Sequence, residues 1–126
     1  MILGIGTDLV LVARIEAVLG RQGDRFARRI LTDAELDRFH RHAQPARYLA
    51  KRFAAKEAIL KALGTGLAKG ISWHDLQIDN DAEGAPHVTV SGAAHLRMQA
   101  SGGGRMLLSL SDEREQALAF AIWSAG

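Results

Sequence analysis

The 126-residue chain contains no cysteine. This absence excludes a disulfide scaffold, a thiolate zinc site and a cysteine nucleophile, and it fits a reducing compartment. Long hydrophobic runs are also missing, since the longest, residues 117–123, is only strand-sized, whereas a membrane span needs roughly 18 residues. The N-terminus lacks a basic segment followed by an apolar stretch and a cleavage site, so no secretory signal is expected. We therefore predict a cytoplasmic protein without a membrane span.

The residues that are present are typical of a globular protein. Of them, 48% are hydrophobic and 24% are charged, which excludes wholesale disorder, and the length favours one domain covering residues 1–126. Residues 1–69 hold 13 Lys and Arg against 7 Asp and Glu, whereas residues 70–126 hold 3 against 7. This split predicts a basic face for nucleic acid, a phosphorylated small molecule or an acidic protein. A solvated basic face without a partner is the alternative.

Apolar spacing predicts about five strands and about four helices. Helices are expected over residues 12–20, from the Thr32–Glu35 capping box through Phe39, and over 46–63 and 93–100. Residues 40–45 are polar and should form a loop. Strands are expected from residue 1 to near Asp8, and over 76–78, 86–90, 105–110 and 117–123, the second and third as a hairpin. The fold class is therefore α+β, with helices packed on a mostly antiparallel sheet.

Two carboxylates are candidates for chemistry. Asp8 ends an apolar strand, where a carboxylate is costly unless it is hydrogen-bonded, paired or bound to a metal; a helix N-cap is the alternative. One helix face carries Phe53, Glu57 and Lys61, which follow one another at intervals of four residues. Glu57 should therefore lie beside the apolar packing of Phe53. The alternative for Glu57 is an ordinary surface pair with Lys61. A partly buried carboxylate beside a lysine makes the better site candidate.

The glycine-rich segment Gly64, Thr65 and Gly66 could bring backbone N–H groups close to a phosphate. Its spacing is not that of a Walker loop, and a plain helix stop is the alternative. The five histidines form no recognised metal pattern, and the chain has no HExxH, so zinc hydrolysis is not expected. The segment therefore remains open between a phosphate loop and a helix end.

Two segments read together resemble a known family. The first is GIGTDLV at residues 4–10 followed by ARI at 13–15; the second is RFAAKEA at 52–58 followed by KALGTG at 61–66. The similarity runs nearly end to end and includes RRIL at 28–31 and GAP at 84–86. In these motifs and their order the chain resembles the holo-[acyl-carrier-protein] synthases, a family of 4′-phosphopantetheinyl transferases.

The resemblance implies a reaction and a set of site residues. The phosphopantetheine arm of coenzyme A moves to a serine hydroxyl of apo acyl carrier protein, and adenosine 3′,5′-bisphosphate leaves. Asp8 and Glu57 match the magnesium ligands and, with Lys61, form the catalytic set. The implied coenzyme A-binding residues are Arg52, Lys61, Gly64, Thr65, Gly66, Pro86 and His87, with Arg52 and Pro86 contributed by a neighbouring subunit of a homotrimer. Carrier docking is implied for Arg14, Arg21, Arg25 and Arg28, which share one side if the helix continues or restarts past Gly23.

The residue types suit this chemistry. Magnesium prefers oxygen ligands, usually one or two carboxylates with phosphates and waters, which Asp8 and Glu57 would supply; manganese shares this preference. Phosphoryl transfer needs charge neutralisation on the pyrophosphate, which Lys61 would assist. The basic half of the chain would steer an acidic carrier to the site, an effect that salt should weaken.

One position departs from the family pattern. Members commonly carry a histidine two residues before the position of Ser109, where this chain has Leu107, which cannot titrate. We therefore hypothesise that the serine proton passes to a magnesium-bound water held by Glu57 or Asp8. The pH–rate profile of Leu107→His tests this, because a large gain near neutral pH would show that the missing histidine matters.

Two other functions compete with the transferase. A non-catalytic relative would bind coenzyme A or a carrier protein without transfer, and the Leu107 departure keeps this alternative open. A small nucleic-acid-binding module would use the basic half of the chain. Tyr48 is the only tyrosine and no interleaved aromatic–basic platform is present, so the nucleic-acid reading ranks lowest.

Overall fold

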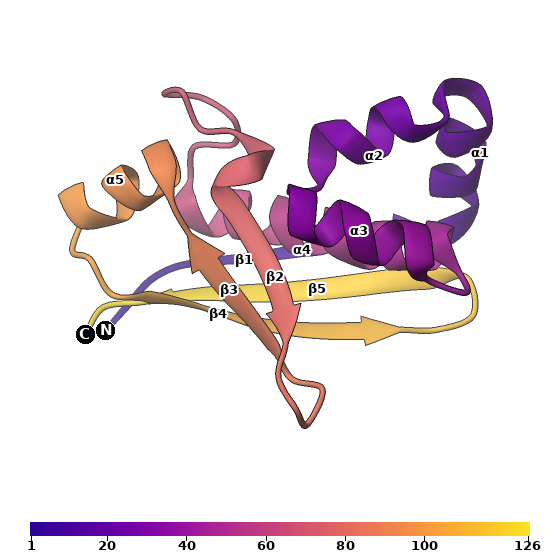
Figure 1. Cartoon of the computed structure of the whole chain (residues 1–126). Helices are drawn as coiled ribbons and strands as arrows, with labels where there is room; N and C mark the ends of the chain where they lie inside the picture. Colours follow the sequence, from indigo (N-terminus) through magenta and orange to yellow (C-terminus); the bar gives the residue numbers. More distant parts are fainter.

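The computed structural model describes all 126 residues, and its five helices lie on one side of a three-stranded sheet (Figure 1). A 3-10 turn, η1, precedes the second strand. The elements in chain order are β1 (Ile2–Leu11), α1 (Val12–Gln22), α2 (Asp24–Ile30), α3 (Asp33–Arg41), α4 (Pro45–Leu63), η1 (Trp73–Asp75), β2 (Leu76–Asn80), β3 (Pro86–Val90), α5 (Gly92–Ala100), β4 (Arg105–Asp112) and β5 (Gln116–Ser124). The α+β fold class predicted from the sequence is confirmed.

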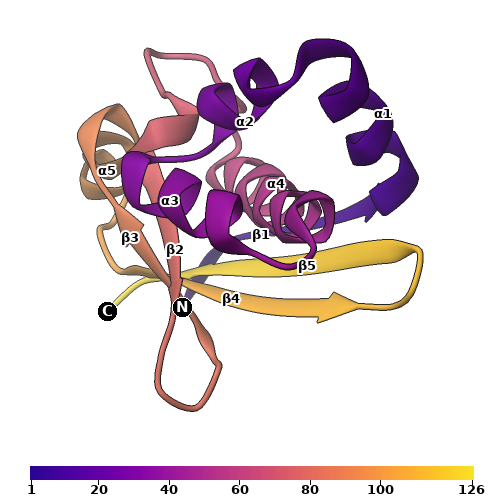
Figure 2. The same cartoon turned by 45° about the vertical axis from the view of Figure 1, so that its right-hand side comes forward.

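The five strands form two antiparallel sheets rather than one. β1, β5 and β4 pair in that order, with β5 in the middle, and β2 pairs only with β3. The β2–β3 hairpin contacts β4 and extends past the three-stranded sheet, away from α2 and α3 (Figure 2). The predicted hairpin is therefore confirmed, and it projects one of its ends beyond the rest of the molecule.

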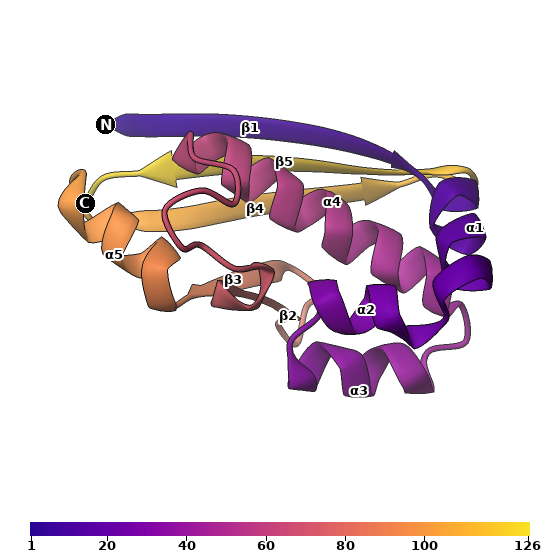
Figure 3. The same cartoon turned by 90° about the horizontal axis from the view of Figure 1, so that it is seen from above.

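Helix α4 lies across the three-stranded sheet (Figure 3). Small side chains make this contact close: Ala54, Ala55, Ala58 and Ala62 of the helix and Ala117, Ala119 and Ala121 of β5 are all buried. On β1, an added Cβ at Gly4 would lie 2.0 Å from the Ala62 carbonyl oxygen, and one at Gly6 would lie 2.0 Å from that of Ala58. The alternating glycines therefore let β1 approach the helix more closely than any other residue would allow.

The other face of the three-stranded sheet carries exposed apolar side chains. Side chains alternate between the faces of a strand, so the residues between the buried ones point away from α4. The large exposed ones on this face are Ile5, Leu9, Leu11, Leu107, Leu118 and Phe120, each between 39% and 61% accessible. No helix covers this face (Figure 1).

Three sequence predictions differ from the structure at element ends. β1 continues past Asp8 to Leu11, because β5 pairs with it as far as Gln116. A separate helix, α2, begins at Asp24 after Gly23 takes a positive φ of 59°, which makes five helices instead of about four. The expected loop from residue 40 to 45 shrinks, since α3 runs to Arg41 and α4 begins at Pro45. The capping box of Thr32 and Glu35 is confirmed.

Candidate active site

Asp8 lies on the face of β1 that meets α4, where Lys61 reaches it. The Lys61 Nζ donates to the Thr7 carbonyl oxygen at 2.9 Å and to Asp8 Oδ1 at 3.2 Å. The Asp8 side chain is 17% exposed and that of Lys61 is 54% exposed. Helix α1 has Leu11 as its N-cap residue, without a side-chain cap, so the N-cap alternative for Asp8 is wrong. The Lys61 ammonium therefore pairs with a largely buried carboxylate.

Glu57 is half-buried on α4 and forms no ion pair with Lys61, so the surface-pair alternative is also wrong. Burial raises the pKa of Glu57, the Asp8 carboxylate raises it further, and the Lys61 ammonium opposes both effects. The influence of Asp8 shows that the two carboxylates lie close enough to repel each other. The structure therefore brings together an early and a mid-chain acid that are separate in the sequence.

A hollow of about 180 Å³ opens beside Glu57. Its lining includes Leu60, Lys61, Gly64, Gly66, Leu67 and Trp73. Gly64 ends α4 in the left-handed conformation, and its N–H donates to the carbonyls of Leu60 and Lys61. The helix stop is confirmed, and the same turn forms a wall of the hollow. Thr65 is not among the lining residues, and its exposed hydroxyl donates to the Gly66 carbonyl oxygen at 3.0 Å.

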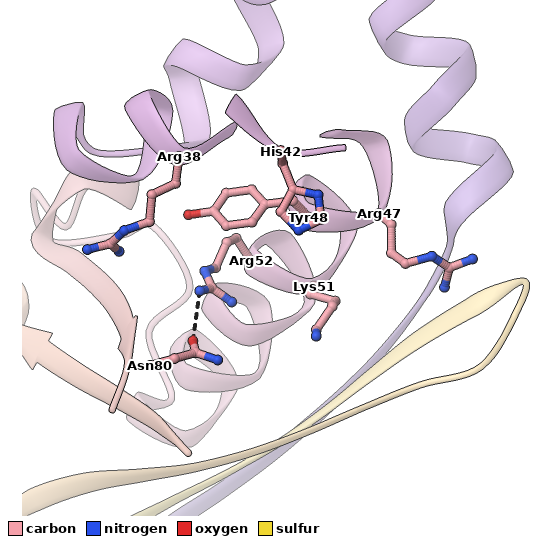
Figure 4. A pocket seen from close by; sticks show the side chains of 7 residues that line it. All are labelled: Arg38, His42, Arg47, Tyr48, Lys51, Arg52 and Asn80. Carbon is pink, nitrogen blue, oxygen red and sulfur yellow. Dashed lines mark hydrogen bonds between the residues drawn. The ribbon is translucent and has the colours of Figure 1, made fainter. Parts of the chain in front are cut away.

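Arg52 lies in a second pocket of about 340 Å³, at the other end of α4 (Figure 4). Four permanent cations line it: Arg38, Arg47, Lys51 and Arg52. Arg38 pairs with Asp79, and Asp112 lies 3.3 Å from Arg47 and 3.5 Å from Lys51. Arg52 has no acidic partner. The pocket therefore keeps an excess of positive charge.

The guanidinium of Arg52 is held in a fixed position. It lies 4.7 Å from the centre of the Tyr48 ring and donates to Asn80 Oδ1 at 2.9 Å. Its Nε and the Tyr48 hydroxyl are both buried without a hydrogen-bond partner. Both atoms are inaccessible to solvent, so what the pocket offers an anion is the fixed positive charge of the guanidinium.

Sequence reasoning named Arg52 but missed the other residues of its pocket. Arg47 and Lys51, like Tyr48 and Arg52, are four residues apart on α4, and this spacing was a usable signal. Arg38 on α3 and Asn80 on β2 were not accessible in the same way, because only tertiary packing brings them to α4.

The remaining predicted residues lie outside the Glu57 hollow. Pro86 and His87 begin β3; Pro86 pairs with Asn80, and His87 Nε2 lies 3.1 Å from Asp81 Oδ2. The hairpin that carries them therefore borders the Arg52 pocket. The four predicted carrier-docking arginines are all exposed, with Arg14 and Arg21 on α1 and Arg25 and Arg28 on α2.

Leu107 lies on the apolar outer face of the sheet. It pairs with Ile122, which in turn pairs with Ile5. Asp8 is three residues beyond Ile5 and therefore points to the opposite face. Within one chain, a histidine at position 107 would have the sheet between it and the two carboxylates.

The raised pKa of Glu57 gives a prediction about stability. Its ionised form lowers the free energy of unfolding of the metal-free protein, fully so above the raised pKa. As pH falls from there towards the ordinary glutamate value, the folded state takes up the proton first and the penalty disappears. Glu57→Gln should therefore raise the free energy of unfolding at pH 7 by up to about 1 kcal/mol, with no gain at pH 4. Urea unfolding at both pH values checks this, and an equal gain at both would contradict it.

Comparisons with known proteins agree with this geometry. A family model described as the 4′-phosphopantetheinyl transferase superfamily matches residues 4–120. The holo-[acyl-carrier-protein] synthase of Vibrio cholerae is 53% identical over 123 residues, 97% of each chain.

Two solved structures share the fold as well as the sequence pattern. The crystal structure of the Neisseria meningitidis holo-[acyl-carrier-protein] synthase superposes with a TM-score of 0.92 at 44% identity, covering 98% of this chain and 99% of that one. The Bacillus anthracis enzyme, in complex with CoA (3′,5′-ADP), gives a TM-score of 0.83 at 34% identity over 100% and 99% of the two chains. This chain therefore belongs to the 4′-phosphopantetheinyl transferase superfamily and, within it, to the holo-[acyl-carrier-protein] synthases.

Proposed function

We propose that Asp8, Glu57 and Lys61 form the centre at which this chain transfers the phosphopantetheine arm of coenzyme A to a serine of apo acyl carrier protein. The observation that carries the assignment is the meeting of the two acids beside a lysine, at the rim of a hollow. The serine oxygen attacks the phosphorus that bears the pantetheine arm, and the bond from that phosphorus to adenosine 3′,5′-bisphosphate breaks.

The two carboxylates suit a magnesium ion. The Asp8 carboxylate raises the cost of ionising Glu57, so a divalent cation between the two would relieve this repulsion. No cluster of three or more His, Cys, Asp or Glu residues exists in the structure, which agrees with an ion that takes its other ligands from phosphates and water. When bound, magnesium would neutralise charge on the pyrophosphate.

Residues of this chain would contact the leaving phosphate, help to remove the serine proton and leave space for a phosphate. Lys61 is half exposed, so its ammonium can leave Asp8 and contact an oxygen of the departing phosphate. We assign the proton of the carrier serine to a water molecule that Glu57 or Asp8 would hold. Gly64 and Gly66 leave room for a phosphate close to the backbone.

The basic pocket of Arg52 would hold another anionic part of coenzyme A. Its excess of positive charge supports this role, as does the adjoining hairpin with Pro86 and His87. No residue lines both this pocket and the Glu57 hollow. That separation favours a site assembled between subunits, with Arg52 supplied by a neighbour.

Self-association, as a homotrimer, would also cover the apolar outer face of the three-stranded sheet. Leu107 belongs to that face, so its departure from the family histidine adds to the apolar surface. Monomeric proteins rarely leave a contiguous apolar patch of this kind exposed.

A single hydrophobic core contains residues from every helix and from four of the five strands. This shared core supports one domain over residues 1–126.

Mixing two inactive variants should test the shared site. In co-expressed trimers of Arg52→Ala and Glu57→Ala chains, random assortment leaves about a quarter of the sites with both intact residues. Activity should return to about that fraction of wild type, although each variant alone is inactive. Sedimentation establishes the mass of the assembly. A mixture as inactive as its components would place both residues in the same chain's site.

Carrier docking should depend on the exposed arginines of α1 and α2. Arg14→Ala is expected to raise KM for the carrier about threefold to tenfold while changing KM for coenzyme A less than twofold. Added salt should raise the wild-type KM for the carrier more steeply than that of the variant. Steady-state kinetics at 50 and 300 mM salt measure both effects. Arg114→Ala, an exposed arginine in the β4–β5 turn whose side chain makes no ion pair, is the matched control.

A single assay tests the transfer itself. The protein is mixed with apo carrier protein, coenzyme A and magnesium, and the carrier is weighed by mass spectrometry. A gain equal to one phosphopantetheine is expected, and it should require both coenzyme A and the divalent ion. Binding of either substrate without a mass gain would identify a non-catalytic relative.

None of the five helices has the length and apolar character that a membrane span requires. The cytoplasmic location stays a prediction.

A further inference from the structure

A fully buried ion pair joins α3 and α4 next to the active site. The Lys56 Nζ lies 2.6 Å from Glu35 Oε1, and both side chains are 0% exposed. The same ammonium donates to the Ile30 carbonyl oxygen at 2.7 Å and to the Trp73 carbonyl oxygen at 3.4 Å. Burial lowers the pKa of Lys56, and Glu35 opposes this shift. Neither residue has a part in the transfer described above.

Both oxygens of the Glu35 carboxylate also accept hydrogen bonds from backbone N–H groups. Its Oε1 accepts the Thr32 N–H at 2.9 Å, and its Oε2 accepts the Ile78 N–H at 2.7 Å. A buried ion pair gains little net stability, because the cost of removing two charges from water offsets their attraction. An apolar pair of similar volume would fill the same space. The charges therefore call for an explanation other than stability.

The contacts of the pair reach each part of the proposed site. Ile30 ends α2, the helix that carries Arg25 and Arg28. Trp73 lines the Glu57 hollow, and Ile78 lies in β2, two residues before the Asn80 that holds Arg52. Lys56 itself is the residue next to Glu57. One ammonium and one carboxylate thus connect the carrier-docking helix, the hollow and the hairpin.

Two other contacts join α2 to this region. His74 Nε2 of η1 lies 2.8 Å from the Arg28 carbonyl oxygen of α2, at an exposed position, and the second contact is aromatic. Phe26 of α2 lies 5.7 Å from Phe53 of α4, between ring centroids, and Phe53 lies 5.5 Å from Trp73. Apolar contacts of this kind have little directionality and tolerate small displacements of a helix. Hydrogen bonds to a charged group are directional and short. The Lys56 hydrogen bond to Ile30 is both buried and charge-assisted, whereas that of His74 is exposed, so the ion pair is the stronger constraint on the position of α2.

We propose that Glu35 and Lys56 are positioning residues, which fix α2 relative to Asp8, Glu57 and Lys61. This inference rests on the proposed function, since it assigns the pair the alignment of a docked carrier serine with the phosphate of coenzyme A. A displaced α2 would still bind the carrier, but it would present the serine in the wrong place. Misplacement of a reacting group by about 1 Å costs on the order of 10²-fold in rate.

The double variant Glu35→Gln/Lys56→Met separates positioning from stability. Each single change strands a buried charge and should lower Tm by about 10–20 °C, whereas the neutral double should regain most of that loss. We expect its kcat for apo carrier protein to stay at least about tenfold below wild type. Its KM for the carrier, and its Kd for adenosine 3′,5′-bisphosphate measured by calorimetry, should stay within about threefold of wild type. If both Tm and kcat recovered in the double variant, the ion pair would only stabilise the fold, and the positioning role would be wrong.

Two further variants keep the test decisive if the double does not fold. Glu35→Asp retains both charges and shortens one side chain by a methylene, so kcat should fall while the protein stays folded. A lower Tm with an unchanged kcat for this variant would overturn the proposal. Met98→Ala is the matched control: it destabilises a buried site on α5, and below its Tm its kcat should equal that of wild type. Absence of transfer by wild type itself would instead refute the proposed function.

Discussion

Replacement of Glu57 by alanine should lower the rate of holo-carrier formation about 10³-fold, because it removes one of the two carboxylates that meet at the site. No other His, Cys, Asp or Glu clusters there to take its place. The substitution also removes one of the two acids proposed to hold the water that accepts the serine proton. The rate of mass gain on the carrier, at saturating coenzyme A and magnesium, measures the loss. The loss should appear in kcat/KM for both substrates.

A second helical acid with a cation four residues further on provides the control. Asp37 on α3 is paired at 2.7 Å with Arg41, four residues on, as Glu57 precedes Lys61 by four. Asp37→Ala removes one negative charge and should leave the rate unchanged, since exposed pairs of this kind contribute little. Calorimetric titration of manganese in the presence of coenzyme A should show binding to the Asp37 variant and none to the Glu57 variant. A Glu57→Ala enzyme with more than a tenth of wild-type activity would refute the site assignment.

The sequence predicted those parts of the site that depend on local patterns. Phe53, Glu57 and Lys61 share a helix face because of their spacing alone, and Gly64 ends that helix because glycine tolerates a positive φ. The strand at Asp8 was predicted too short. Leu9 and Leu11 are apolar on the exposed face of the sheet, so they do not show the alternation that marks a half-buried strand.

Features that depend on tertiary packing were less accessible. Lys56 and Glu57 are adjacent in the sequence and equally polar, yet one is fully buried and the other faces a hollow. Successive helix positions differ by about 100°, but the pattern does not say which acid, 21 residues away, reaches the buried lysine. The assignment of Asp8 and Glu57 to one centre came from the family resemblance. Nothing in either residue's own neighbourhood predicts that β1 packs on α4.

The close approach of β1 to α4 predicts that Gly6→Ala is severely disruptive. Its Cβ would lie 2.0 Å from the Ala58 carbonyl oxygen, 2.8 Å from the Ala62 nitrogen and 2.9 Å from the Lys61 Cβ. These are backbone atoms and the root of a side chain, so no rotamer change relieves the clash. The strand must move away from the helix, and we expect a loss of about 3 kcal/mol or more in the free energy of unfolding. Thermal and urea unfolding measure it.

The same displacement should also lower activity in whatever fraction stays folded. Asp8 lies on the same face of β1 two residues beyond Gly6, so a shifted strand carries it away from Lys61 and Glu57. We expect kcat to fall at least tenfold at a temperature well below the variant's Tm. Gly20→Ala is the matched control, because Gly20 lies in α1 with no atom within 4 Å of the added Cβ. There the same substitution should stabilise the protein by about 0.5–1 kcal/mol, since alanine favours a helix over glycine. If Gly6→Ala were as stable and active as Gly20→Ala, β1 and α4 could not pack closely enough to bring the two acids together.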